Sequence, residues 1–269
     1  MIAINEFPNT VIDDCLLIND DCLEVMDKLI ENNVKVDAII TDLPYGITAC
    51  SWDSVIPLKD MWAKLNKLTN NNTPIILFGC QPFTSKLVMS NPKLFKYEII
   101  WQKNVPTGFF NAKTQQMKIH ENILVFYNNK PTYNPQMVKR TEEEYRKSVR
   151  INDSECNNPQ IYNSGRKKLI RKTAEQQRYK YPTTICQIKK DRKLDTKLHP
   201  TQKPIELMEY LIKTYTNEYE LVLDFTAGSF STGIACQNTN RKFIGIELEE
   251  RYYNIGVERI TNNSLENKK

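Results

Sequence analysis

The chain has 269 residues, of which 26% are charged and 40% hydrophobic, so it can bury a full core and is not expected to be disordered. No apolar run approaches the ~18 residues of a membrane helix, and Met1–Glu6 lacks the basic-then-apolar layout of a secretion signal, which argues against a membrane or exported protein. Seven cysteines without a Cys-x-x-Cys pair favour free thiols in a reducing cytosol, and two histidines are too few for a structural zinc site, so we expect a cytoplasmic protein without a metal.

Seven short apolar or β-branched runs bounded by polar residues predict β-strands. These runs lie at residues 15–19, 36–41, 74–79, 97–101, 122–127, 221–224 and 242–247. Helix-like segments such as 23–30 and 205–212 lie between most of them, and this alternation predicts an α/β fold with a doubly wound, mostly parallel sheet. No obvious helix separates the runs 97–101 and 122–127, so we expect that pair to be antiparallel.

One polar strand end is the segment Thr41–Gly46, which follows the apolar run 36–40. Open α/β sheets bind their ligands at the carboxyl ends of such strands. The Asp42 carboxylate and the Leu43 carbonyl can each accept one N–H of an exocyclic amine, while Tyr45 can stack on the ring that carries it. Pro44 stiffens the turn by fixing φ. This pattern indicates a receptor for a planar amine, although a strand end with a proline turn and a surface tyrosine is also consistent with it.

The positive charge of the chain belongs to one segment. Residues 139–193 contain 16 Lys and Arg against 7 Asp and Glu, a net of +9, whereas the remainder contains 21 and 25, a net of −4. Tyrosines and amides are interleaved with this charge, a mixture that suits phosphate and base-edge contacts in a nucleic acid. A solvated basic loop is the competing interpretation.

A second polar strand end is the segment Asp224–Ser229, which follows the apolar run 221–223. Gly228 permits a ligand to approach the backbone closely, because a side chain there would collide with it. Two polar strand ends in one parallel sheet predict two bound molecules that meet at one edge.

Four motifs in order resemble the β class of amino-methylating DNA methyltransferases, which act on adenine N6 or cytosine N4. Asp42-Leu43-Pro44-Tyr45 resembles their Asp-Pro-Pro-Tyr catalytic motif, and residues 224–233 resemble their S-adenosylmethionine (AdoMet) loop. Residues 199–204 and 119–126 resemble two further blocks of the class. The resemblance covers nearly the whole chain apart from residues ~130–197.

The resemblance implies the seven-stranded, Rossmann-like AdoMet methyltransferase sheet in a circularly permuted order. Residues 1–129 would then form the catalytic half, 130–197 a basic target-recognition insertion, and 198–269 the AdoMet-binding half.

The resemblance also implies the residues that bind AdoMet. The loop residues Asp224, Phe225, Gly228 and Ser229 would wrap its methionine portion, and Lys203 would lie near the methionine carboxylate. Glu247, at the end of the next predicted strand, can accept both ribose hydroxyls. Asp21 and Cys22 would contact the adenine, with a helix N-cap as the alternative role, favoured more for Asp20 than for Asp21. Phe230 stands where the family has a second glycine, so it must turn away from the ligand or narrow its site.

The implied activity is methylation of the N6 amine of a flipped-out adenine in double-stranded DNA, with Asp42, Leu43, Pro44 and Tyr45 as the catalytic residues. Leu43 replaces a proline of the family motif but keeps the backbone carbonyl. The basic residues expected to contact DNA are Arg166, Lys167, Lys168, Arg171 and Lys172. His120 and His199 are interpreted as structural. A homodimer and a cognate restriction endonuclease are partners that the resemblance admits.

Other functions remain open at this stage. Cytosine N4 is the first alternative, although the opening Asp of the motif favours adenine. An inactive, methyltransferase-like DNA-binding protein is the second, motivated by Leu43 and Phe230. RNA or protein-glutamine methylation is a weaker alternative. Cytosine C5 chemistry is excluded because none of the thirteen prolines precedes a cysteine. The recognition sequence does not follow from these residues.

Overall fold

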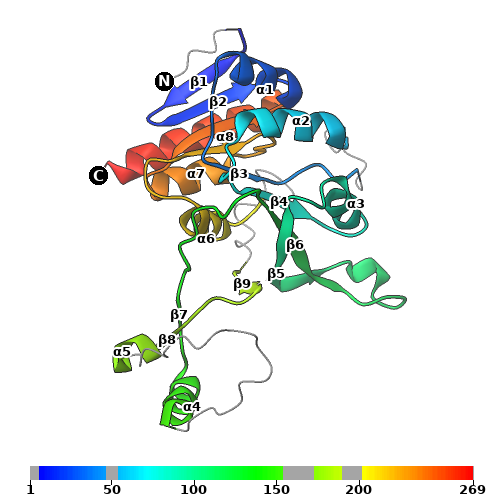
Figure 1. Ribbon diagram of the computed structural model, residues 1–269. Coiled ribbons are helices and arrows are strands. Elements are labelled where there is room, and N and C mark those ends of the chain that lie inside the picture. The colour runs from blue at the N-terminus through cyan, green and yellow to red at the C-terminus, as the bar shows by residue number, and fades with distance from the viewer. Residues whose placement is uncertain (1–5, 47–53, 154–172, 190–201, 269) are drawn as a thin grey trace. The chain divides into compact units, whose positions relative to one another are not determined.

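The computed structural model describes residues 6–46, 54–153, 173–189 and 202–268 (Figure 1). It divides into two compact units, the first comprising residues 1–134 and 184–269 and the second residues 135–183. The second unit lies within the predicted insertion 130–197, while residues from 184 onward belong to the first unit. No helix in the described ranges is long and apolar enough to cross a membrane.

A nine-stranded sheet forms the centre of the first unit, in the order β1-β2-β11-β10-β3-β4-β6-β5-β9. Its strands are β1 (Asn9–Ile12), β2 (Cys15–Asn19), β3 (Ala38–Thr41), β4 (Ile75–Gly79), β5 (Phe95–Thr107), β6 (Lys118–Phe126), β9 (Ile185–Gln187), β10 (Leu221–Asp224) and β11 (Lys242–Glu247). Each of the seven predicted runs lies on one of these strands. The expected count of seven needs correction, because β1 and β9 add an edge strand on either side. Both are short and largely exposed, so neither carries the apolar run that a buried strand requires.

The sheet is mostly parallel, and its exceptions lie toward the two edges. β6 runs antiparallel to both β4 and β5, which confirms the orientation predicted for the runs 97–101 and 122–127. In the middle, β10 and β3 are parallel neighbours, and the chain leaves them in opposite directions, toward β11 and toward β4. Such a reversal opens a crevice at the carboxyl ends of the two strands. Both polar strand ends named above lie at this point.

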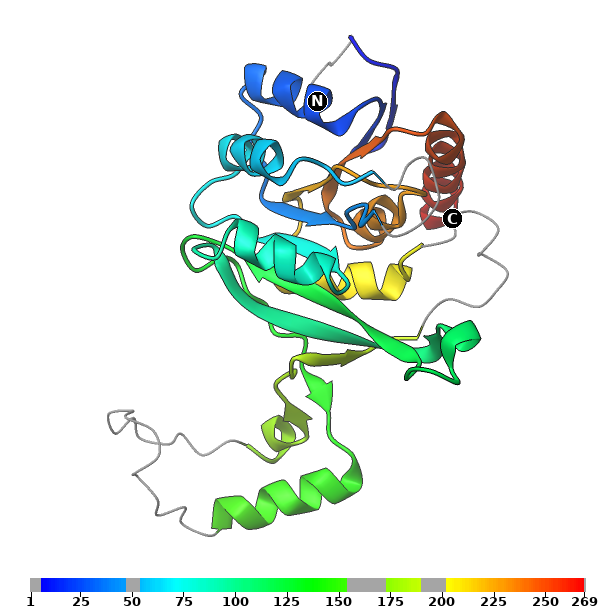
Figure 2. The ribbon, with the colours of Figure 1, turned by 90° about the vertical axis from the view of Figure 1, so that its right-hand side faces the viewer.

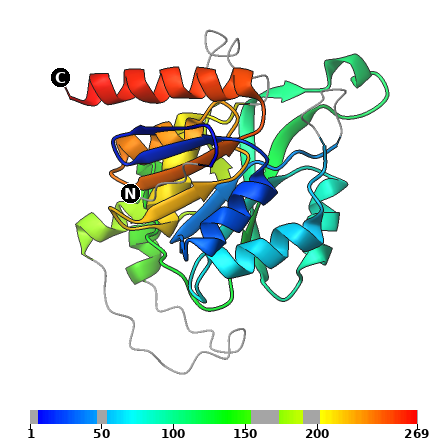
Figure 3. The ribbon, with the colours of Figure 1, turned by 90° about the horizontal axis from the view of Figure 1, so that it is seen from above.

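Helices cover both faces of the sheet, as a doubly wound fold requires (Figures 1 and 3). One face packs against α1 (Cys22–Glu31), α2 (Leu58–Leu68) and α3 (Phe83–Ser90). The other packs against α6 (Ile205–Tyr215), α7 (Ser231–Asn238) and α8 (Glu250–Asn267). Successive strand residues alternate between the two cores, as Ile39 and Ile40 do, so each strand is apolar on both sides. This double burial explains why the strands were readable as continuous apolar runs.

Strands β5 and β6 extend beyond the sheet as a hairpin that is closed by the short 3-10 helix η1 (Phe109–Asn111), drawn in green in Figure 2. Thr107 at the end of β5 pairs with Lys118 at the start of β6.

The second unit contains the antiparallel pair β7 (Val138–Lys139) and β8 (Tyr179–Lys180) with helices α4 (Glu142–Asp153) and α5 (Ala174–Gln177). Within it Lys180 pairs with Glu144, and the Arg178 guanidinium lies 4.8 Å from the centre of the Tyr145 ring. Basic and aromatic side chains are therefore in contact in this unit.

Candidate active site

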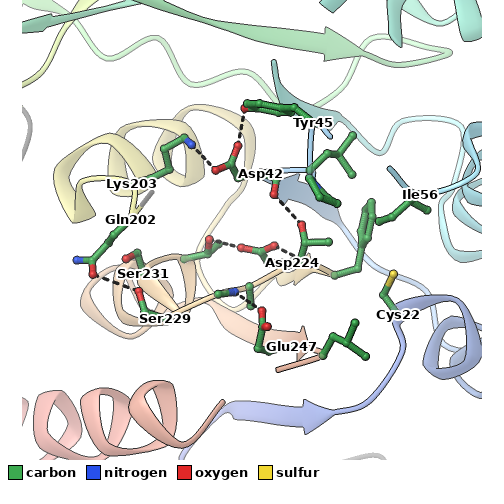
Figure 4. A pocket seen from close by; sticks show the side chains of 18 of the residues that line it. Cys22, Asp42, Tyr45, Ile56, Gln202, Lys203, Asp224, Ser229, Ser231 and Glu247 are labelled. Carbon is green, nitrogen blue, oxygen red and sulfur yellow. Dashed lines mark hydrogen bonds and ion pairs between the residues drawn. The ribbon is translucent and has the colours of Figure 1, made fainter. Parts of the chain in front are cut away.

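The β3 strand end presents Asp42 and Tyr45 to a common cavity (Figure 4). Asp42 directly follows the buried strand β3, and the Tyr45 hydroxyl donates to Asp42 Oδ1 over 2.6 Å. The Tyr45 ring packs against Phe83 of α3, with ring centres 5.2 Å apart. The carbonyl-bearing Leu43 is itself buried, and it lines the cavity together with Pro44. The structure thus brings the four residues of the predicted amine receptor to one place.

The Lys203 ammonium lies against the Asp42 carboxylate, as Figure 4 shows. Its ammonium donates to Asp42 Oδ2 and lies 3.4 Å from Glu121 Oε2. The family resemblance predicts that Lys203 lies near the methionine carboxylate of AdoMet. In the structure Lys203 pairs with Asp42 and Glu121. Glu121 is in turn paired with Lys103 of β5, so four charged side chains form a continuous row.

The charges in this row shift one another's pKa. Burial alone would raise the pKa of Glu121, but the ammonium groups of Lys203 and Lys103 outweigh burial and hold that pKa at about 2. Burial raises the pKa of Asp42, while Lys203 acts in the opposite direction. Burial also tends to lower the pKa of Lys203, but Asp42 and Glu121 raise it above its usual value. Lys203 and Glu121 are therefore ionised at neutral pH.

At the β10 strand end, Asp224 is buried and fully engaged by neutral donors. It accepts hydrogen bonds from the hydroxyls of Thr41 and Thr232, over 2.7 and 2.5 Å, and from the Thr226 backbone N–H over 3.2 Å. Burial raises its pKa to about 6 despite these hydrogen bonds. The Thr226 hydroxyl also donates to the Asp42 carbonyl over 3.0 Å, so the two strand ends are tied together.

Glu247, the last residue of β11, holds the glycine loop. Its Oε2 accepts from the Gly228 N–H over 2.7 Å and its Oε1 from the Glu249 N–H over 2.9 Å. Burial raises the pKa of Glu247 to about 7, against the effect of these two donors. Gly228 has φ of 55°, in the left-handed region that favours glycine. The loop can therefore turn sharply enough to bring its backbone to the cavity.

Phe230 turns away from the cavity, which settles the alternative that the sequence left open. Its side chain is fully buried and packs on the rings of Phe243 and Tyr253. Space for the ring comes from two glycines, because a Cβ on Gly245 or Gly256 would lie 2.6 or 2.0 Å from Phe230. This chain thus accommodates the larger residue by leaving room beneath the loop.

Asp21 caps helix α1, accepting from the N–H groups of Leu23 and Glu24 over 2.8 and 3.3 Å. The N-cap role, which the sequence favoured for Asp20, therefore belongs to Asp21. Asp20 instead accepts from the Asp21 N–H over 2.7 Å. Asp21 and Cys22 also line the cavity, so capping and ligand contact are compatible here.

The two strand ends share a cavity of about 670 Å³, within the size range of small-molecule sites. All the predicted catalytic and cofactor residues line it, namely Asp21, Cys22, Asp42, Leu43, Pro44, Tyr45, Lys203, Asp224, Phe225, Gly228, Ser229 and Glu247. Apolar walls are supplied by Val55, Ile56, Pro57 and Leu248.

Several residues of the site were not predicted from the sequence. Lys103 and Glu121 line the cavity without a role assigned to either, although Glu121 lay within one of the family-like blocks. Its charge directly before the buried run 122–126 was the available signal. Arg259 of α8 donates to the Ser229 carbonyl and hydroxyl, which supports the glycine loop from behind.

Some predicted residues lie outside the described ranges. They are His199 and the expected DNA contacts Arg166, Lys167, Lys168, Arg171 and Lys172. His120 is exposed on β6, and no group of three potential metal ligands occurs among the described residues.

The chain is similar in sequence and in structure to known methyltransferases. Residues 36–258 match the family N6_N4_Mtase, described as DNA methylase. The chain is 45% identical over 62 residues to the DNA adenine methyltransferase YhdJ of Escherichia coli, a match that covers 23% of the chain and 21% of that relative. It is 26% identical over 251 residues to the type II methyltransferase M1.MboII of Moraxella bovis, covering 87% of the chain and 92% of that relative. The crystal structure of the M1.HpyAVI–SAM complex superposes with a TM-score of 0.62 at 26% identity, covering 91% of this chain and 98% of that one.

Proposed function

Since this chain belongs to the N6/N4 DNA methylase family, we propose that it transfers a methyl group from AdoMet to the N6 amine of an adenine in double-stranded DNA. The observation that carries the proposal is the pairing of two strand ends over one cavity. The β3 end carries an amine receptor, Asp42 with the Leu43 carbonyl, and the β10 end carries the glycine loop around Gly228. Donor and acceptor of one group transfer would meet between them.

AdoMet is the methyl donor, and the residues of the β10 and β11 ends fit it. Glu247 is a buried carboxylate that faces the cavity and retains lone pairs for the ribose hydroxyls. Gly228 and Ser229 would hold the methionine portion, while Asp21 and Cys22 would lie at the adenine, beside the apolar walls. When bound, AdoMet supplies an activated methyl group on a sulfonium. The protein would contribute by orienting the methyl donor and the amine and by stabilising the charge that develops on the amine nitrogen.

The difficulty of the reaction lies in the acceptor, because the lone pair of an aromatic amine is delocalised into its ring. Asp42 and the Leu43 carbonyl would each accept one amine hydrogen, which favours a pyramidal nitrogen directed at the methyl group. Such alignment contributes several kcal/mol, about 7 or more in well-oriented cases. The Asp42 carboxylate also stabilises positive charge that develops on the nitrogen. The product amine then loses a proton to solvent.

The target base would have to leave the helix, because its amine is inaccessible inside a duplex. Tyr45, which lies beside Asp42, would stack on the flipped base. We assign phosphate contacts to the basic residues Arg166, Lys167, Lys168, Arg171 and Lys172 within the insertion 130–197, on charge alone.

The order of the strands supports a circularly permuted methyltransferase sheet. The strand that carries the glycine loop, β10, comes near the end of the chain, whereas β3 with the amine receptor comes near its start. We therefore propose that residues 1–129 and 198–269 form the catalytic and cofactor halves. A homodimer and a restriction endonuclease that shares the recognition site are further proposals from the family resemblance.

Cytosine N4 is the alternative substrate, since the matched family contains both specificities in its name. Asp42 at the start of the catalytic motif favours adenine. Expression of the protein in a host without its own DNA methylation, followed by nucleoside analysis and methylation-sensitive long-read sequencing, tests this. We expect N6-methyladenine at one recurrent sequence. N4-methylcytosine would replace the substrate assignment, and unmodified DNA from a protein that binds AdoMet would replace the activity.

A further inference from the structure

Four side chains of alternating charge run from the catalytic carboxylate into the protein: Asp42, Lys203, Glu121 and Lys103. They come from four separate elements, the β3 end, the segment before α6, β6 and β5. Lys203 bridges Asp42 and Glu121, and Lys103 pairs with the other oxygen of Glu121. The side chains of Lys203, Lys103, Glu121 and Asp42 are only 7%, 9%, 16% and 22% exposed. We call this set the charge row.

The charge row contains two carboxylates and two ammonium groups and is therefore electrically neutral. Removing one member of a buried ion pair is strongly destabilising, because an uncompensated charge remains in a poorly solvated place. Aromatic rings line the two cations, with Lys203 5.0 Å from the centre of the Phe78 ring and Lys103 5.2 Å from that of Trp101. Burying four charged side chains is unfavourable, and the row ends at Asp42, which faces the cavity. The row therefore indicates a role beyond packing.

We propose that Lys103 and Glu121 are positioning residues that hold the Lys203 ammonium on Asp42, so that Asp42 stays an ionised hydrogen-bond acceptor for the target amine. This inference rests on the proposed role of Asp42. A protonated Asp42 would carry an O–H donor on one oxygen and only a neutral acceptor on the other, so it would hold the amine hydrogen less firmly and would not compensate the positive charge on the nitrogen. Asp42 is desolvated by burial, which favours the protonated form unless a cation opposes it.

The other ionisable groups that face Asp42 cannot replace Lys203. Tyr45, from the turn after β3, contributes a neutral hydroxyl to Oδ1. Glu121 from β6 is an acid whose charge adds to burial in raising the pKa of Asp42. Asp224 from β10 is also an acid, and its own pKa is raised by burial and by Asp42. Lys203 is therefore the cation that faces Asp42 among the described residues. Lys103 acts at one remove, because it neutralises Glu121, which would otherwise compete with Asp42 for Lys203.

The charge row predicts opposite effects for neighbouring substitutions. Lys203→Met and Lys103→Met leave the row with one excess negative charge, so the pKa of Asp42 rises. Glu121→Gln leaves one excess positive charge, so the pKa of Asp42 falls. The double variant Lys103→Met with Glu121→Gln restores neutrality. A merely structural role would make the variants less stable without any such difference in sign.

The experiment is the pH dependence of single-turnover methyl transfer at saturating AdoMet and DNA. The acidic limb is the part of the pH–rate profile in which transfer falls as Asp42 becomes protonated. We expect the midpoint of this limb to move up by about 1–3 pH units for K203M. It should move up by less for K103M, because Lys103 is farther from Asp42. The limb should move down for E121Q and return toward that of the wild type in K103M/E121Q. The conservative K103R and the exposed control Lys113→Met should keep the wild-type limb.

The outcomes separate this inference from its alternatives. The KM for AdoMet is measured in parallel, because a Lys203 that served only the methionine carboxylate would raise that KM and leave the limb unchanged. If K103M does not fold, E121Q still decides, because its acidic limb must lie below those of the wild type and of K103M/E121Q. If E121Q does not fold, K103M decides, because its limb must lie above both. If the acidic limbs of all variants coincide with that of the wild type, or if K103M and E121Q shift it in the same direction, the proposed positioning role of Lys103 and Glu121 is wrong. Near-wild-type transfer by Asp42→Ala would overturn the proposed function instead.

Discussion

Two buried carboxylates lie at the ends of adjacent parallel strands, Asp224 on β10 and Asp42 after β3, yet their partners differ in kind. Asp224 is bound by two hydroxyls and one backbone N–H, all neutral. Asp42 is bound by one hydroxyl and an ammonium. Neutral donors fix the position of a carboxylate but leave its charge poorly compensated, whereas a cation fixes the charge as well. The comparison separates an acid that holds the turn after β10 in place from one whose negative charge is compensated by a cation at the cavity.

The largest effect on the proposed AdoMet side of the cavity is expected from Glu247→Ala, which should weaken AdoMet binding. Loss of a charged hydrogen-bond partner costs about 1.5–3 kcal/mol, or a ~10- to 150-fold increase in the Kd for AdoMet. Isothermal titration calorimetry measures it, with the exposed Glu250→Ala as the matched control. An unchanged Kd in E247A would mean that the ribose is held by other residues.

An effect of at most the same size is expected from Thr232→Val, which removes one neutral donor from Asp224 at nearly constant volume. A hydrogen bond to a charged group contributes about 1.5–3 kcal/mol, so the free energy of unfolding should fall by up to that amount. Urea unfolding checks this, with Thr261→Val on the exposed side of α8 as control. The acidic limb of methyl transfer should not move. A shifted limb would show that the two carboxylates do not have separate roles.

A third prediction concerns the pH dependence of stability without AdoMet. Burial raises the pKa of Glu247 from its ordinary 4.5 to about 7, so the folded state binds its proton more tightly than the unfolded state does. Its stabilising contribution is complete below 4.5 and is lost as pH rises through about 7. Glu247→Gln should therefore flatten the decline in unfolding free energy over that window. Equal slopes for wild type and E247Q would refute the raised pKa.

Glu121 titrates in the opposite sense. Its pKa is lowered to about 2, so its contribution is present above its ordinary value of 4.5 and disappears as pH falls through about 2. The stabilising contribution of Glu121 should therefore be lost in acid, whereas that of Glu247 should be lost toward neutral pH.

The strands and both strand ends were predictable because their signals are local. A doubly buried strand is an apolar run, and the carboxyl ends of parallel strands meet at one edge. That rule brings Asp42, Asp224 and Glu247 together without any knowledge of packing. Edge strands β1 and β9 lack the signal, since they bury little.

The charge row was not predictable, because its members come from distant parts of the chain. Lys203 and Asp42 are 161 residues apart, and no periodicity pairs them. The orientation of the Phe230 side chain was not predictable either, because it also depends on residues that are distant in the sequence. Its departure from the family pattern was visible, but the space left by Gly245 and Gly256 appears only when β11 and α8 pack beneath the loop.

The most direct test of the account is single-turnover methyl transfer to DNA by Asp42→Ala, with AdoMet binding measured on the same preparation. Retained AdoMet affinity shows that the variant is folded and that the β10 side is intact. Transfer should then fall by at least ~10²-fold, through lost alignment and lost charge stabilisation. Asp60→Ala, an exposed acid at the start of α2, should transfer at the wild-type rate. Near-wild-type transfer by Asp42→Ala would contradict the assignment of Asp42 as the residue that receives the target amine.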